Sequence, residues 1–173
     1  AIVFVLAPIL GAISDQAVAY IERHQREHLG TPHFTYVAYT APHWPLHAHD
    51  EDIAKYKGRF DRGWDALREA RLAKLVASGI LDEHWELTAR DPTQPPWTQA
   101  EHKQWLLRCM EVYAAQIDRM DQGIGRIVAA LKRSGQLDDT VVIFLSDNGA
   151  CAEDIPEGVT VDELVNKLMI AKA

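Results

Sequence analysis

The hydrophobic and polar positions of this chain follow two different periods, one typical of strands and one typical of helices. Two short runs rich in β-branched and aromatic residues, at 34–39 and 140–145, predict buried strands. Apolar residues recur every three or four positions from Asp15 to about His28, with Ser14 as the expected N-cap, and again from Gln99 or so to Lys132. This order of elements predicts an α/β fold with a partial parallel or mixed sheet flanked by helices.

Weaker patterns fill the remaining stretches. Short helices are expected at 50–57 and at 67–77, and the prolines within 91–96 predict a loop because each removes a backbone donor. A capping-box pattern that begins at Thr160, followed by spaced apolar residues, predicts a short amphipathic helix near the C-terminal end.

Two glycines, Gly123 and Gly125, interrupt the long predicted helix. Each costs about 1 kcal/mol relative to alanine in a helix interior. Close packing against another element would explain them. Gly135 is expected to end the helix, since glycine readily adopts the left-handed conformation found just beyond many helix C-termini.

The bulk composition is typical of a soluble protein with one core: 173 residues, 47% hydrophobic and 25% charged. The net charge of −7 argues against a nucleic-acid partner, because phosphate binding needs a basic face. Residues 1–10 are apolar and predict a buried strand, but a membrane span needs about 18 such residues. They also lack the initiator Met and basic region of an intact signal peptide, so we expect a soluble protein of the cytoplasm or periplasm.

Candidate metal chemistry lies where the second predicted strand ends. Asp147 and Asn148 follow it directly and present adjacent oxygen donors, and Gly149 lets the backbone turn. Such oxygens suit Ca²⁺ or Mg²⁺ better than soft metals. Asp-Asn-Gly is also an ordinary polar turn, and two residues cannot close a calcium shell of six to eight oxygens. The turn alone therefore leaves both interpretations open.

The first predicted strand ends in a histidine loop. His43 lies between Pro42 and Pro45, which restrict the backbone around it. An imidazole there could act as a general acid near neutral pH, or it could be a solvated loop histidine. His47 and His49 lie close by in the sequence, but their spacing matches no specific zinc pattern.

Together these residues resemble the sulfatase family of the alkaline-phosphatase-like superfamily, especially bacterial arylsulfatases. A lone Asp-Asn-Gly is a weak signal, but four segments in the order of the family are highly specific. The resemblance covers residues 14–153 and leaves 1–13 and 154–173 without a clear match. The segments that carry it are Tyr36–Leu46, Asp50–Gly58 with Gly63–Asp65, Tyr113–Gly123 and Ile143–Gly149.

The resemblance implies a fold and a chemistry. The chain would be an internal piece of the sulfatase core, from a family that hydrolyses sulfate esters with Ca²⁺ and a formylglycine nucleophile. Asp147 and Asn148 match two of the calcium ligands of the family, and the aspartate is also placed to assist the nucleophile. His43 matches the histidine that contacts the sulfate and helps the leaving oxygen depart.

The departures from the family pattern limit the expected activity. The nucleophile of the family lies in a Cys-x-Pro-Ser-Arg or Ser-x-Pro-Ser-Arg segment, and neither Cys109 nor Cys151 has Pro and Arg at those positions. The second glycine of the usual Asp-Asn-Gly-Gly is Ala150. We therefore expect the chain to be inactive alone.

Two alternatives stay open at this stage. One is a non-enzymatic remnant that associates with itself through exposed sheet edges, since unpaired edges favour association. The other is a phosphatase or phosphodiesterase of the same superfamily. Those sites usually carry zinc ligands of the Asp and His type, so Asp147 followed by Asn148 favours calcium and a small sulfate ester.

Overall fold

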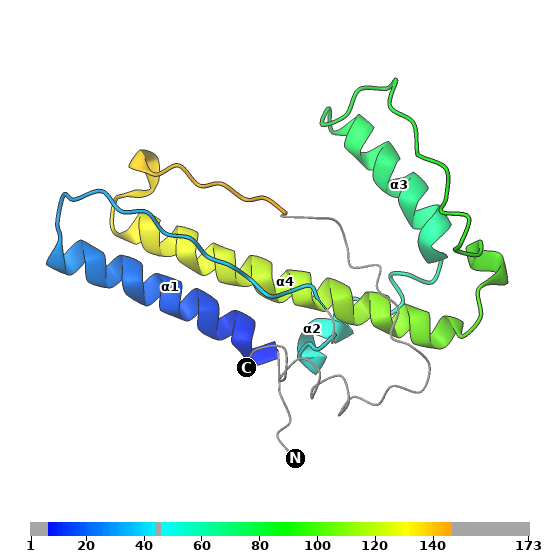
Figure 1. The fold of residues 1–173 in the computed structure, drawn as a ribbon, viewed down its shortest axis with the longest axis horizontal. Coiled ribbons are helices and arrows are strands. Elements are labelled where there is room, and N and C mark those ends of the chain that lie inside the picture. Colours follow the sequence, from blue (N-terminus) through cyan, green and yellow to red (C-terminus); the bar gives the residue numbers. More distant parts are fainter. Residues whose placement is uncertain (1–6, 44–45, 147–173) are drawn as a thin grey trace, which may run out of the picture. The chain divides into compact units, whose positions relative to one another are not determined.

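The computed structural model describes residues 7–43 and 46–146 of the chain. Two compact units divide it, Ala1–Ile143 and Phe144–Ala173, and nearly all described residues belong to the first. Four α-helices and two 3₁₀ turns form the described part (Figure 1). In chain order they are α1 (Ala7–Glu27), α2 (Asp50–Ala54), α3 (Gly63–Ala77), η1 (Trp97–Gln99), α4 (Lys103–Arg133) and η2 (Leu137–Asp139).

Helices α1 and α4 lie side by side and build the core (Figure 1). Each buries one face, as an amphipathic helix does when it packs against a neighbour, and the buried residues of α1 lie three or four positions apart. Two ion pairs flank the contact, Arg126 with Asp15 at 3.2 Å and Arg133 with Glu22 at 3.1 Å. The buried apolar residues of the pair are Leu10, Ala17 and Ile21 on α1 and Ala115, Met120, Ala130 and Leu131 on α4.

The two helices approach most closely where Ser14 meets Gly123. Ser14 is fully buried, and a Cβ atom added to Gly123 would lie 2.1 Å from its Oγ. The prediction that close packing explains a glycine is therefore confirmed for Gly123, whereas nothing lies within 4 Å of a Cβ at Gly125. The predicted N-cap role of Ser14 is wrong, because α1 already begins at Ala7 and the Ser14 hydroxyl donates to the Leu10 carbonyl at 2.9 Å.

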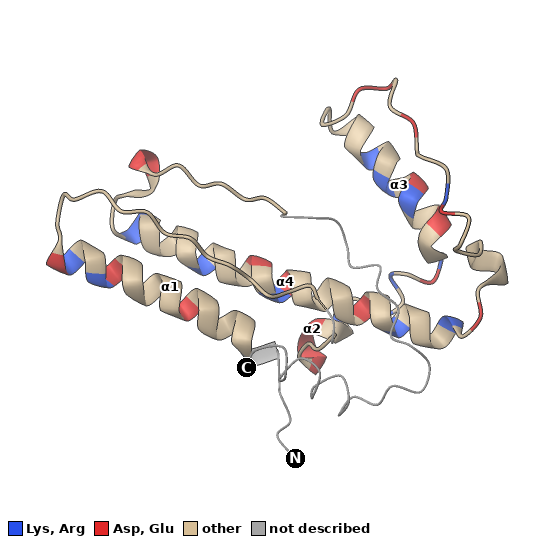
Figure 2. Cartoon of the chain, in the orientation of Figure 1, with Lys and Arg blue, Asp and Glu red and all other residues tan. Residues whose placement is uncertain are grey.

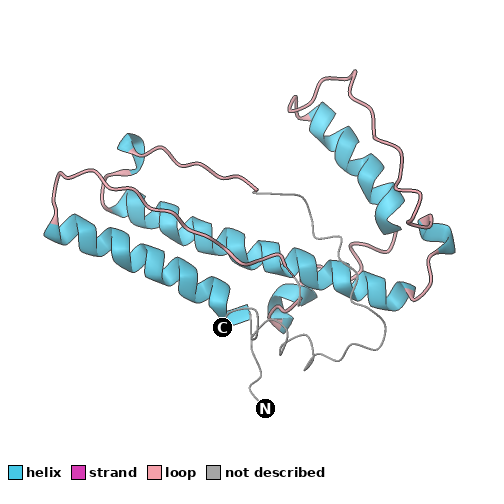
Figure 3. Cartoon of the chain, viewed as in Figure 1, coloured by secondary structure: helices cyan, strands magenta, loops and turns pink. Residues whose placement is uncertain are grey.

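The predicted sheet is absent from the described part of the chain, which contains helices and loops only (Figure 3). Both 34–39 and 140–145 are loop segments there, so the α/β fold with a partial parallel or mixed sheet is wrong for these residues. Most of their apolar side chains face solvent: Phe34 is 92% exposed and Val141 is 86% exposed. A strand needs a neighbouring strand for its N–H and C=O groups, and neither segment pairs with one among the described residues.

The observed helices match the predicted ones better than the strands do, because the hydrogen bonds of a helix join residues that are close in the sequence. The long helix is confirmed as α4, although residues 97–99 form η1 instead of its first turn. Gly135 ends it with a left-handed φ of 71°. Helix α2 is shorter than predicted and α3 begins earlier, at Gly63. Residues 7–10, expected in a strand, begin α1, and the helix expected near Thr160 lies outside the described residues.

Helix α3 is joined to η1 by one carboxylate and two indole rings. Asp65 accepts hydrogen bonds from the Trp97 backbone N–H at 2.8 Å and from Arg90 at 2.9 Å. The Trp64 and Trp97 rings meet edge to face with centroids 4.8 Å apart. None of the described helices is both long enough and apolar enough to cross a bilayer.

Candidate functional site

The candidate site residues fall in two parts of the chain, and the structure describes only one. His43 lies between the segment 34–39 and α2, where the described residues 40–43 and 46–49 form a loop, and it is exposed. Asp147 and Asn148, predicted as metal ligands, lie outside the described residues.

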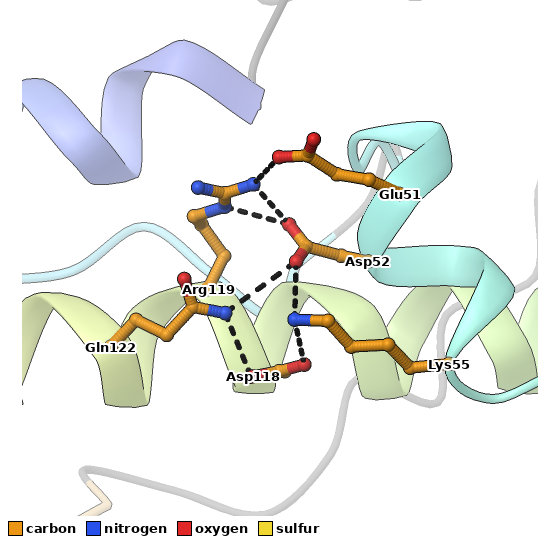
Figure 4. Close-up of polar contacts among 6 residues, drawn as sticks. All are labelled: Glu51, Asp52, Lys55, Asp118, Arg119 and Gln122. Atoms are coloured by element: carbon orange, nitrogen blue, oxygen red, sulfur yellow. Dashed lines mark hydrogen bonds and ion pairs between the residues drawn. The ribbon is translucent and has the colours of Figure 1, made fainter.

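A cluster of polar side chains anchors the helix that follows this loop (Figure 4). Its centre is Asp52 of α2, which is 1% exposed. One carboxylate oxygen of Asp52 accepts from Arg119 Nε at 2.7 Å, and the other accepts from Lys55 Nζ at 2.8 Å. Gln122 Nε2 adds a longer hydrogen bond of 3.4 Å. A buried carboxylate is stable in this position because donors reach both of its oxygens.

Outer partners complete the Asp52 cluster, which we define as Glu51, Asp52, Lys55, Asp118, Arg119 and Gln122. Glu51 accepts from Arg119 at 2.6 Å. Asp118 accepts from Lys55 and from Gln122, both at 2.9 Å. Acidic residues occupy the start of α2, which packs beside α4 (Figure 2). Each charged group of the cluster thus contacts a group of opposite charge.

The environment keeps these groups ionised. Burial by itself raises the pKa of Asp52, but hydrogen bonds and charges from Lys55 and Arg119 outweigh burial and hold the pKa below its ordinary value. The hydrogen bond from Gln122 is the largest cause that lowers the pKa of Asp118, and the hydrogen bond and charge of Lys55 lower it further. The hydrogen bond to Asp52 is the largest cause that raises the pKa of Lys55. The cluster is therefore a set of fixed charges at neutral pH.

The chemistry of the cluster is structural. Each of its three carboxylates already contacts Lys55 or Arg119, and these two cations offset two of the three negative charges. No group of three His, Cys, Asp or Glu residues in the described ranges is arranged to hold a metal ion. The cluster fixes α2 to α4.

A small hollow lies between the loop and α4. It encloses no space large enough for a water molecule, and Gln116 of α4 lies at its wall with only 3% of its surface exposed. Gln116 Oε1 has no hydrogen-bond partner in the part of the chain that the structure describes. The hollow is lined by Leu10, His47, Ala48, His49, Gln116 and Arg119. The end of the loop, His47 to His49, therefore lies next to Gln116 and Arg119 of α4.

Comparisons with known proteins decide the family. The family model described as "Sulfatase" matches residues 11–164, which is most of the chain. This chain belongs to the sulfatase family. An uncharacterized sulfatase of Schizosaccharomyces pombe is 43% identical over 120 residues, covering 68% of this chain and 22% of that protein.

Other sulfatase relatives agree. The arylsulfatase of Klebsiella aerogenes is 38% identical over 124 residues, 69% of this chain and 26% of that enzyme. Human N-sulphoglucosamine sulphohydrolase is 54% identical over 33 residues, 19% of this chain and 7% of that enzyme. The chain spans about a quarter of the length of the first two relatives it matches.

Sequence reasoning missed the centre of the Asp52 cluster in this sulfatase chain. Asp52 lies among acidic residues that are usual at the exposed start of a helix, and Arg119 lies 67 positions further along. Asp118 likewise gains its ion-pair partner, Lys55, from a residue 63 positions earlier in the chain. One signal was available: the two halves of the cluster fall in two different segments that resemble the sulfatases, Asp50–Gly58 and Tyr113–Gly123.

Proposed function

We propose that this chain is part of a sulfuric ester hydrolase of the arylsulfatase type. The sulfatase family acts on sulfate esters, and the match over residues 11–164 carries the proposal. The similarity to an enzyme named arylsulfatase supports an aryl sulfate as the test substrate. Because the chain spans about a quarter of its relatives, the activity belongs to the whole protein.

In this proposal His43 assists the departure of the leaving oxygen. Its imidazole is exposed to solvent, so a substrate can reach it without any opening of the core. A histidine can donate a proton to an alkoxide or phenoxide as the ester bond breaks, and such general acid catalysis contributes about 10²- to 10⁴-fold to rates. His43 is therefore the residue whose removal tests the proposal most directly.

Sulfatases typically bind a metal, and we propose that this one is Ca²⁺. The carboxylate of Asp147 and the amide oxygen of Asn148 would supply two hard oxygen ligands, which fit calcium by type. Bound calcium supplies positive charge that stabilises the sulfate oxygens. A shell of six to eight oxygens needs further ligands from outside this pair. Asp147 is also proposed to assist the formylglycine nucleophile.

The nucleophile itself is not encoded in these residues. The printed sequence contains no Cys-x-Pro-Ser-Arg or Ser-x-Pro-Ser-Arg segment from which formylglycine could form. The 173-residue chain alone should therefore not turn over a sulfate ester. Robust hydrolysis of an aryl sulfate by the purified chain, lost in His43→Ala, would contradict this inactivity.

A chimera tests the function itself. The matching part of the Klebsiella aerogenes arylsulfatase would be replaced by residues 36–149 of this chain, and hydrolysis of 4-nitrophenyl sulfate with Ca²⁺ measured. The chimera is expected to keep activity and to lose about 10²-fold or more with His43→Ala. His47→Ala is the matched control, since His47 is also an exposed histidine before α2, and it should leave the rate nearly unchanged. Equal rates for both variants would refute the role of His43.

We also propose that the isolated chain associates with a second copy of itself. The sequence predicted this through exposed sheet edges, and the same segments, 34–39 and 140–145, remain unpaired and apolar among the described residues. Sedimentation velocity at increasing concentration should show dimers or larger species. A chain that stays monomeric up to about 100 μM, a concentration at which weak interfaces of about −5.5 kcal/mol begin to populate, would count against it.

A further inference from the structure

We propose that one turn of α4, residues 119–123, fixes both ends of the loop 40–49 and thereby positions His43. The proposal rests on the proposed function, which gives His43 its chemical role. Arg119 and Gly123 are four residues apart, so they lie on the same face of α4, one above the other. Each of them contacts an anchor at a different end of the loop.

The first anchor is Tyr39, the residue just before the loop. Its hydroxyl lies 2.9 Å from Ser14 Oγ. Because the single hydrogen of Ser14 is given to the Leu10 carbonyl, the Tyr39 hydroxyl donates to Ser14. A Cβ on Gly123 would lie 3.2 Å from the Tyr39 oxygen, so this hydroxyl sits directly over the glycine.

Within its segment, Tyr39 makes the hydrogen bond to Ser14. Phe34 is 92% exposed and Tyr36 is 82% exposed, whereas Tyr39 and Val37 are partly buried. The Tyr39 hydroxyl therefore joins the end of the segment, directly before the loop, to α1.

The second anchor is Asp52, in the first turn of α2. Arg119 Nε donates to its buried carboxylate at 2.7 Å. The backbone N–H groups of Asp52 and Ile53 both donate to the His49 carbonyl at 3.0 Å, which ties the last loop residue to the same turn. The loop end also lies at the hollow that Arg119 lines.

Together the two anchors hold the described loop residues 40–43 and 46–49 at points that lie four residues, or about 6 Å of axial rise, apart on α4. Fixing both ends removes conformational freedom that would otherwise be lost when a substrate binds. Tyr39, Ser14, Gly123, Asp52 and Arg119 are positioning residues in this scheme. None of them needs to touch the substrate.

The test is backbone NMR relaxation on the ¹⁵N-labelled full chain, in which the order parameter of the His43 amide is measured. The unaltered chain should show a value near about 0.85, and Tyr39→Phe should lower it towards about 0.6 or less. Tyr36→Phe is the matched control, since it removes a hydroxyl from an exposed tyrosine of the same segment. It should leave the His43 value unchanged.

A second variant keeps the test decisive if Tyr39→Phe perturbs the helix pair. Arg119→Lys retains the charge but cannot reproduce the planar donor contacts to Asp52, and it should lower the same order parameter while circular dichroism shows an unchanged helix content. The amides of Ile21 and His24, near the C-terminal end of α1, serve as internal references. An order parameter already near 0.6 in the unaltered chain, or unchanged in both variants, would overturn the proposal.

This measurement needs no catalytic activity. If the chimera kept its rate with His43→Ala, the proposed function would fail while the loop could still be anchored. If the order parameter did not respond, the anchoring would fail while His43 could still be catalytic. The two results therefore test separate statements.

Discussion

A pair of glycine substitutions in α4 tests the close helix contact with an internal control. Gly→Ala in a helix interior stabilises by about 0.5–1 kcal/mol because alanine loses less backbone freedom on folding. At Gly125 nothing lies within 4 Å of the new Cβ, and the site is exposed. Gly125→Ala should therefore raise the free energy of unfolding by about that amount.

At Gly123 the same change has the opposite sign. The new Cβ would lie 2.1 Å from Ser14 Oγ and 3.0 Å from Ser14 Cβ, so the helices must separate or the serine must rotate. Overpacking costs about 1–3 kcal/mol, and loss of the serine hydrogen bonds adds about 1 kcal/mol each. After the propensity gain, Gly123→Ala should destabilise by about 1–3 kcal/mol.

Thermal unfolding followed by circular dichroism measures both effects. For a chain of this size, about 1 kcal/mol corresponds to a shift of 2–4 °C in Tm, so the variants should melt several degrees apart. Ser14→Ala in the Gly123→Ala background should recover part of the loss by removing the nearest atom. The reasoning is refuted if Gly123→Ala and Gly125→Ala stabilise equally, because the two helices would then not approach as closely as described.

Three further outcomes follow from the site. Asp52→Asn should lower stability by about 1–3 kcal/mol in urea unfolding, because Lys55 and Arg119 lose their buried counter-charge. The lowered pKa of Asp52 gives stability that is present above its unfolded value and lost as pH falls through the lower folded value. The difference in free energy of unfolding between the unaltered chain and Asp52→Asn should therefore shrink below about pH 4. A difference that stays constant at all pH values would contradict this. Calorimetry should show calcium binding weaker than about 10⁻⁶ M, since Asp147 and Asn148 supply only part of a shell.

The helices could be predicted from the sequence because their determinants are close in the chain. The apolar residues of α4 repeat every three or four positions, and Gly135 marks its end within two residues of Arg133. The predicted strands at 34–39 and 140–145 depended on partners elsewhere. Their composition indicated a preference for a sheet, but no neighbouring strand exists among the described residues to satisfy it.

In the candidate site, too, features set by local sequence could be predicted and contacts between distant residues could not. His43 could be singled out from its proline-rich loop and from the family resemblance, both of which are properties of local sequence. The contact between Asp52 and Arg119 joins residues 67 positions apart, and no spacing rule connects them. The close packing of Gly123 could be anticipated, but its partner Ser14 could not.

The burial of Asp52 also determines how the molecule responds to ionic strength. Dissolved ions screen charges across solvent but hardly reach a carboxylate that is 1% exposed. The pairs Arg126–Asp15 and Arg133–Glu22, which link α1 to α4, involve exposed or half-exposed side chains and weaken as salt is added. Helix α2 therefore stays attached to α4 in concentrated salt, and the loop that carries His43 keeps its second anchor where surface ion pairs no longer contribute.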